Sequence, residues 1–274
     1  MFGKLIKHEF KNTWRYMLVI NAAVVLLSLI GMLQMHLIKT SSSYFIQKMS
    51  TIYLVLYVVA IIALVVVTFF YLVGRFYKKM FTTEGYLMHT LPVTADQHIG
   101  SMLITDYVWW IEFSAVSMLC LFFCFFTEEV NWSEFSQVLT YVAGHVRITP
   151  EFVALILAMI ISPAVMLLNV YCALALGQLF KTHRILGAVI MYILMYVVLS
   201  TISSNLLLGN VGGSSLMGKY FFTYEGGQGP EAFFDGMNSF LGSMGIYSFV
   251  SNLVVGAIYW FLTRFMIRNH LDIQ

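Results

Sequence analysis

The sequence predicts an all-α integral membrane protein with six transmembrane helices. Of its 274 residues, 60% are hydrophobic and only 10% are charged, whereas about 25% are charged in an ordinary soluble domain. A water-soluble chain of this composition would expose large apolar patches, so lipid is the expected solvent. Six apolar stretches are long enough to cross a hydrocarbon core, which requires about 20 residues. Their number gives the number of helices.

The six spans are expected within one transmembrane domain, residues 1–274. They are predicted at residues 17–38, 51–74, 97–126, 152–180, 185–208 and 245–265. Two of their boundaries have independent support. Thr94 and Gln97 have the spacing of a capping box, which opens the third span. Thr149, Pro150 and Glu151 supply a cap, a proline at the first helical position and an acid in the first turn of the fourth.

The distribution of Lys and Arg predicts that both ends of the chain are cytoplasmic. With that orientation, eleven Lys and Arg residues fall in inside segments and four in outside segments, as the positive-inside rule requires. The net charge of +2 is small, and no nucleic-acid partner is expected.

Two segments outside the spans carry their own expectations. Residues 1–16 place Phe2, Ile6 and Phe10 at helical spacing among lysines, which indicates an amphipathic helix in the membrane interface. The alternative is an ordinary basic flank. The extracellular segment 209–244 is rich in Gly and Ser but also carries aromatic residues, so part of it is expected to form short helices on the outer face.

Motifs for chemistry within this chain are not found. The sequence contains no phosphate loop, so it is not expected to bind ATP in that manner. Its histidines are scattered, and the adjacent acids Glu128 and Glu129 lack the further ligands that an intramembrane metalloprotease needs. Cys120, Cys124 and Cys172 lie in apolar stretches and are interpreted as small buried side chains. We therefore predict no catalytic, cofactor or metal site in the chain.

Three polar residues within predicted spans are candidates for a translocation path: Asp106, Glu112 and Asn169. An acid within the bilayer is costly and usually faces a cavity or a partner. Asp106 and Glu112 project about 120° apart around a helix, so they are not expected to form one site. The alternative is that one or both snorkel to the interface or bond to a neighbouring helix, and for Asn169 interhelical bonding is the default.

The segment from Arg75 to Val93, between the second and third spans, carries the most specific pattern. It resembles the cytoplasmic loop of ATP-binding-cassette (ABC) transporter permeases of the type-two exporter family. Many Gram-positive members carry Glu-Gly-Tyr-Leu there, then a short interval and Thr-Leu-Pro. The matching positions are Glu84, Gly85, Tyr86, Leu87, Thr90, Leu91 and Pro92. Weaker likenesses at residues 7–11 and 263–271 extend the resemblance over the whole chain, although Ser101-Met102 departs from a common Ser-Lys.

The resemblance implies the membrane-spanning subunit of an ABC exporter in a bacterial cytoplasmic membrane. It implies a pair of permease chains, identical or homologous, and two separate ATPase subunits that bind ATP and Mg²⁺. The substrate would be amphipathic: an antimicrobial peptide, a drug or a lipid-like molecule. Docking on the ATPase would use a short helix in a groove. The residues expected to couple are Phe76, Tyr77, Phe81, Glu84, Gly85, Tyr86, Leu91 and Pro92.

Other interpretations remain open from the sequence. Glu84-Gly85 can be a plain helix-ending turn, and Leu91-Pro92 an ordinary break before a helix. A membrane scaffold or sensor subunit that anchors a partner is the second hypothesis. A secondary transporter is the third, because it would favour a repeat with broken helices, which the sequence does not display.

Overall fold

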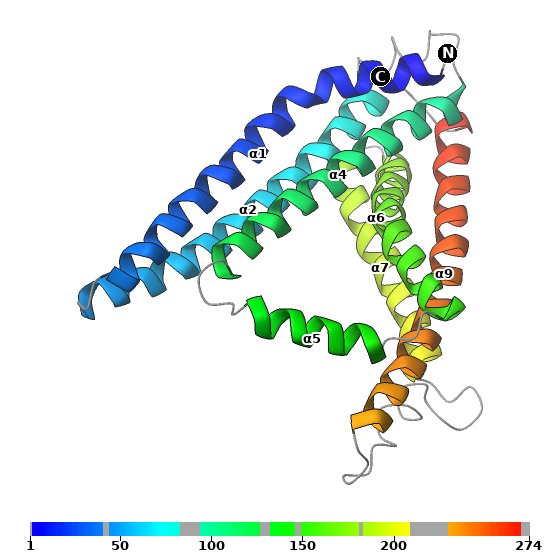
Figure 1. Ribbon diagram of the computed structural model, residues 1–274. Coiled ribbons are helices and arrows are strands. Elements are labelled where there is room, and N and C mark those ends of the chain that lie inside the picture. Colours follow the sequence, from blue (N-terminus) through cyan, green and yellow to red (C-terminus); the bar gives the residue numbers. More distant parts are fainter. Residues whose placement is uncertain are drawn as a thin grey trace. The chain divides into compact units, whose positions relative to one another are not determined.

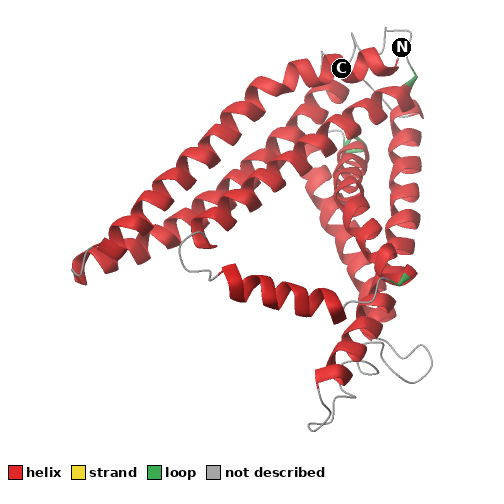
Figure 2. Cartoon of the chain, in the orientation of Figure 1, coloured by secondary structure: helices red, strands yellow, loops and turns green. Residues whose placement is uncertain are grey.

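The computed structural model describes residues 2–40, 44–82, 94–126, 132–145, 149–180, 183–208 and 230–269. Every regular element in these ranges is an α-helix (Figure 2). Six of the helices are long and apolar enough to cross a membrane. The predicted fold class, an all-α protein with six membrane-spanning helices, is therefore confirmed for the described part of the chain.

The chain divides into two compact units, the first ending at Trp132 and the second beginning at Ser133. The helices of the first unit are α1 (Phe2–Thr40), α2 (Tyr44–Phe81) and α4 (Ala95–Phe126) (Figure 1). Those of the second are α5 (Trp132–His145), α6 (Pro150–Gly177), α7 (Arg184–Leu208) and α9 (Pro230–Asn269). In each unit the first span packs against the other two, α1 against α2 and α4, and α6 against α7 and α9.

Helices α1, α2 and α9 extend well beyond the predicted spans, and one helix was not predicted. The α1 helix runs without interruption through Phe2–Thr40, so the segment expected in the interface and the first span are one helix. The α9 helix starts at Pro230, where a proline suits the first helical position, and no later proline breaks it. Residues 230–244 of the predicted extracellular segment are therefore the start of α9 rather than separate short helices, while 209–229 lie outside the described residues. The 14-residue helix α5 was not predicted, because it is too short to span.

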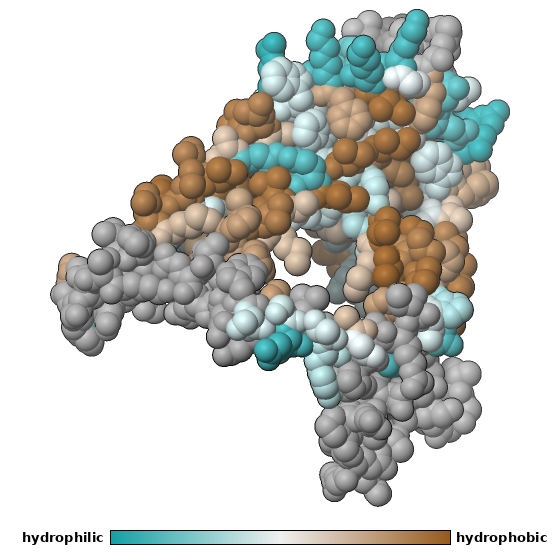
Figure 3. Space-filling view, viewed as in Figure 1, coloured by the Kyte–Doolittle hydropathy of each residue, from teal (hydrophilic) through white to brown (hydrophobic). Residues whose placement is uncertain are grey.

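The outward faces of the spans are apolar. Only 11–28% of the residues in the most apolar window of each span are buried within the chain. Large hydrophobic side chains such as Val19, Leu33 and Phe70 are more than half exposed, and hydrophobic residues cover much of the helices on the face drawn in Figure 3. In water such a surface would aggregate, so the lipid bilayer is its solvent.

One face of α1 is buried along the helix. Glu9, Thr13, Met17, Val24 and Ser28 follow one another at intervals of four or seven residues and are at most 3% exposed. This spacing places them on a single stripe. The lysines of the N-terminal turns are exposed, so the amphipathic pattern read from residues 1–16 separates a buried stripe from a basic one.

The apolar core of the first unit lies where α1, α2 and α4 meet. Val24, Tyr57, Ile61, Phe113 and Cys124 form a buried cluster. Polar atoms within it are paired: the Tyr57 hydroxyl lies 3.0 Å from Ser28 Oγ. Cys124 and Cys172 are buried and Cys120 is half-buried, all three as free thiols, in agreement with their interpretation as small packing side chains.

Both predicted helix caps are present. Gln97 N–H donates to Thr94 Oγ1 at 3.3 Å, and Thr94 N–H donates to Gln97 Oε1 at 3.4 Å, which is the reciprocal pattern of a capping box. Thr149 accepts from Phe152 N–H at 3.3 Å, with Pro150 opening α6. These local bonds fix where α4 and α6 begin.

Close backbone approach holds the second unit together. A Cβ atom added at Gly245 of α9 would lie 2.4 Å from the Glu151 carbonyl oxygen of α6, and one at Gly177 would lie 2.6 Å from the backbone of Ala188 in α7. Helices in lipid gain no hydrophobic driving force from associating, so small residues that permit close van der Waals contact take its place. Gly245 and Gly177 are therefore packing positions.

We expect Gly245→Ala to destabilise the second unit by about 1–3 kcal/mol, the usual cost of overpacking, because the backbone of α6 cannot move aside cheaply. Gly74→Ala is the matched control: it lies within α2 with no atom within 4 Å of the added Cβ, and it should be neutral or stabilising by up to about 1 kcal/mol. Thermal unfolding in detergent measures both. Equal stability of the two variants would contradict the assignment of Gly245.

Candidate functional site

The candidate site lies at the end of the first unit, where the predicted coupling segment leaves α2. The segment was expected to begin at Arg75, and α2 continues past that residue to Phe81. Its later residues, Glu84, Gly85, Tyr86, Leu91 and Pro92, lie outside the described residues. What the structure describes is the two stems of the segment: the last turns of α2 and the first turns of α4.

Four charged side chains from three helices meet beside these stems. Arg75 and Lys79 lie one turn apart on α2, Glu9 lies on α1, and Asp106 lies on α4. Arg75 Nη2 forms an ion pair with Asp106 Oδ1, and Lys79 Nζ forms one with Glu9 Oε2. Arg75 Nη1 also lies 3.8 Å from Glu9 Oε2. We call these four residues the charge cluster.

Thr13 completes the arrangement. Its hydroxyl donates to the Glu9 carbonyl oxygen at 2.9 Å, one turn back on α1, and accepts from Arg75 Nη1. The hydroxyl hydrogen is thus directed along the helix, and the lone pairs are left for the guanidinium group. A threonine at this position of the α1 stripe therefore orients Arg75 between α1 and α4.

The charge cluster contains two acidic and two basic side chains, and all four are almost completely shielded from solvent. Glu9 and Asp106 are fully buried, and Arg75 and Lys79 are at most 8% exposed. The opposite charges balance, two against two, which is the arrangement that lets ionised groups remain in a medium of low dielectric constant. Removing one member would leave its partner as an uncompensated buried charge. The cluster therefore fixes the relative register of α1, α2 and α4.

Two of the aromatic residues that were expected to contact the ATPase are buried within the chain. Phe76 is fully buried and Phe81 is 6% exposed, and their rings are in edge contact with centroids 5.9 Å apart. The prediction that they are surface anchors for a partner is therefore corrected, because the end of α2 is packed rather than solvated. Tyr77 is half-buried, and the centroid of its ring lies 5.9 Å from that of Phe81.

The two intramembrane acids bond to neighbouring helices. Asp106 is held by Arg75 of α2. Glu112, one and a half turns farther along α4, accepts from Asn21 Nδ2 of α1 at 2.7 and 2.9 Å. They face different helices, in agreement with the prediction that they do not form one site. Of the two interpretations left open by the sequence, interhelical bonding describes both, and Asp106 has no exposed surface with which to line a path.

Asn169 belongs to the second unit, on α6. It is half-buried, and its Oδ1 atom is buried with no hydrogen-bond partner in the described part of the chain. Among the described residues no hydrogen bond joins Asn169 to another helix, so its predicted role in interhelical bonding stays a prediction. It does not join the charge cluster.

The sequence does not predict the ion pairs Arg75–Asp106 and Lys79–Glu9, although it marks the residues themselves. Arg75 and Lys79 contribute to the positive-inside distribution, and Glu9 lies in one of the weaker family likenesses. The depth of Asp106 in its predicted span does indicate a basic partner, because an acid in the bilayer requires a counter-charge. The basic residues nearest in the chain that share its helical hairpin are Arg75, Lys78 and Lys79.

Comparison of the chain with protein-family models, with characterised proteins and with solved structures found no match.

We expect Arg75→Gln to destabilise the protein by about 3–5 kcal/mol, because Asp106 would remain buried without its counter-charge. The double variant Arg75→Leu with Asp106→Leu should recover most of this loss, since neither member of the pair is then left as an unpaired charge. Lys78→Gln is the control: Lys78 is exposed, and its change should stay within about 0.5 kcal/mol. Unfolding in detergent measures all three. If Arg75→Gln and Lys78→Gln are equally stable, the cluster does not hold the helices.

Proposed function

We propose that the chain is the membrane-spanning subunit of an ABC exporter, which acts with separate ATPase subunits. The observation that carries the proposal is the charge cluster, which joins the two helices that precede and follow the Glu84–Pro92 motif in the sequence. Both stems of the motif-bearing segment are joined there to each other, through Arg75 and Asp106, and to α1, through Lys79 and Glu9. The motif itself resembles the loop on which permeases of this family receive their ATPase.

The cluster supports the proposal because a coupling loop must transmit force. A loop held by one helix would bend that helix when a partner pushes on it. Here a displacement of either stem is shared by α1, α2 and α4, since breaking the buried pairs is costly. Motion of an ATPase beneath residues 83–93 would then move the three-helix unit as a body.

The proposed assembly has two permease chains and two ATPase chains. ATP and Mg²⁺ bind to the ATPase, because this sequence contains no phosphate loop. Hydrolysis of ATP would move the two permease chains relative to each other. An amphipathic substrate (an antimicrobial peptide, a drug or a lipid-like molecule) would then leave the cytoplasm or the inner leaflet. The membrane is the bacterial cytoplasmic membrane.

The burial of Phe76 and Phe81 changes which residues of the proposed coupling segment can contact the ATPase. Phe76 and Phe81 are assigned to the packing of the α2 end, because both are buried. The proposed contacts with the ATPase are then Tyr77 and the motif residues Glu84 and Tyr86. Gly85, Leu91 and Pro92 belong to the proposal through the family resemblance alone.

A secondary transporter is a weaker candidate than an ABC exporter subunit, because the described spans are continuous helices. Such proteins bind substrate at discontinuous helices near the midplane. Within the described residues each of the six spans is one continuous helix, including α6, which contains Pro163. A scaffold or sensor subunit would share the topology but would not couple ATP hydrolysis to movement of a substrate.

The double variant Glu84→Ala with Tyr86→Ala tests the coupling role. Truncating an aromatic anchor at an interface commonly costs about 2 kcal/mol or more, about thirtyfold in affinity. We expect the tagged variant to insert normally but to retain less of the co-purifying Mg²⁺-dependent ATPase, or to leave its hydrolysis uncoupled from export. Pull-down from native membranes and substrate-stimulated turnover in nanodiscs measure this.

Lys78→Ala is the control for that variant, because Lys78 is exposed on the adjacent turn of α2 but lies outside the motif. Unchanged association, hydrolysis and export in the double variant would remove the segment from the mechanism. An ATPase that co-purifies without any substrate-linked turnover would favour the scaffold instead.

Orientation has its own test, which follows from the eleven-to-four distribution of Lys and Arg. On a background without native cysteines, single cysteines at positions 42 and 228 should react with an impermeant thiol reagent in intact cells. Cysteines at Lys4 and Lys78, both exposed side chains, should react only after the membrane is opened. Labelling at Lys78 from outside would reverse the topology and place the proposed coupling segment on the wrong side.

A further inference from the structure

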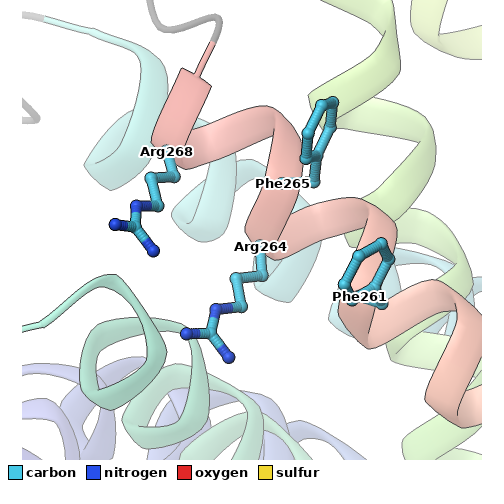
Figure 4. Close-up of a pocket in the computed structure, with 4 residues that line it drawn as sticks. All are labelled: Phe261, Arg264, Phe265 and Arg268. Atoms are coloured by element: carbon cyan, nitrogen blue, oxygen red, sulfur yellow. The ribbon is translucent and has the colours of Figure 1, made fainter.

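The last turns of α9 carry a basic and aromatic hollow. Phe261, Arg264, Phe265 and Arg268 line a cavity of about 440 Å³. Arg264 and Phe265 are adjacent and mark the edges of a sector of about 100° around the helix, with Phe261 and Arg268 between them. Figure 4 shows both arginine side chains extending from the same side of α9, with the two phenyl rings farther round the helix.

The position of this face along α9 is expected to bring it to the boundary of the bilayer. The candidate span is Met244–Arg268, 25 residues, which is about 37 Å of helix against a hydrocarbon core of about 30 Å. We therefore expect the final turn and Arg268 to reach the headgroup layer. Arg264, one turn deeper, can extend its guanidinium group to the same level.

The two arginines fit a phosphate group. Both are exposed and lie one turn apart, so two guanidinium forks can donate to a single phosphodiester. Arginine makes charge-assisted, frequently bidentate hydrogen bonds to phosphate. A cation at the end of a helix is also favoured by the negative C-terminal end of the helix dipole.

The phenylalanines favour a lipid over a soluble anion. Phe261 is 64% exposed and Phe265 is 45% exposed, and their rings are stacked with centroids 6.5 Å apart and planes 18° apart. The rings thus add an exposed apolar surface along the same turns of the helix as the arginines. A free phosphate ion would use the arginines and leave the rings unoccupied, whereas a phospholipid carries acyl chains that are joined to its phosphate through glycerol.

We propose that this face of α9 binds an anionic phospholipid. The phosphodiester lies between Arg264 and Arg268, and the first part of an acyl chain lies along Phe261 and Phe265. The site does not depend on the transport function proposed above, because it uses none of the charge cluster or the coupling motif.

The test uses the full chain purified in detergent and titrated with phosphatidylglycerol or with phosphatidylcholine carrying the same acyl chains. Native mass spectrometry counts the retained lipids. We expect a preference for phosphatidylglycerol that falls about tenfold or more in Arg264→Gln with Arg268→Gln, because the charge-assisted bonds to phosphate are removed.

The matched control is Lys11→Gln with Arg15→Gln. These residues are exposed basic side chains of α1 with the same four-residue spacing, so they test whether any basic pair gives the same result. The control should retain the preference. An unchanged preference in the Arg264 and Arg268 variant, or an equal loss in the control, would overturn the site.

A second arm separates lipid from free phosphate. Inorganic phosphate and glycerophosphate at millimolar concentration should not displace the bound phosphatidylglycerol, and Phe261→Ala with Phe265→Ala should weaken its binding. Phe70→Ala with Phe123→Ala is the control, because both rings are exposed in the other unit, at 65% and 47%. Displacement by soluble phosphate, or full binding without the two α9 rings, would show that the site takes the anion rather than the lipid.

Discussion

The ion pair between Arg75 and Asp106 is the constraint on which the first unit depends. In a membrane neither group can be left ionised alone, since the cost of an unpaired charge in a medium of low dielectric constant is several kcal/mol. The pair therefore fixes the depth of α2 relative to α4, and Lys79 with Glu9 fixes α1 to both. Once these depths are set, the apolar contacts among Val24, Tyr57 and Phe113 follow in register farther along the same helices.

The two units solve the same physical problem by different means. Helices in lipid associate without a hydrophobic driving force, so another source of specificity is needed. The first unit uses buried charges and interhelical hydrogen bonds, including the one from Asn21 to Glu112. The second uses backbone contact at Gly177 and Gly245, where a single added Cβ would collide with the neighbouring helix. Charge pairs fix a direction and a depth, whereas glycine contacts fix a distance of approach.

The sequence predicts well what depends on local pattern. The six spans follow from apolar runs, and the starts of α4 and α6 follow from Thr94 and Thr149 with their neighbours, because hydropathy and capping act within a few residues. Pairing across helices depends on the tertiary fold, so Glu9 and Lys79, 70 residues apart, were not predicted as partners. The exposure of Phe76 and Phe81 was mispredicted for a related reason: a helix that leaves the membrane was assumed to meet water, but this one remains packed. The long uninterrupted α9 was missed because Gly and Ser residues suggested a loop.

The length of α2 has a mechanical consequence. Its charge-free stretch from Met49 to Gly74 contains 26 residues, about 39 Å of helix, which exceeds a hydrocarbon core of about 30 Å. A span longer than the core is accommodated by a tilt, a kink or a local thickening of the bilayer. Because the end of α2 near Arg75 is joined by ion pairs to α1 and α4, any tilt of α2 would be shared by all three helices of the first unit.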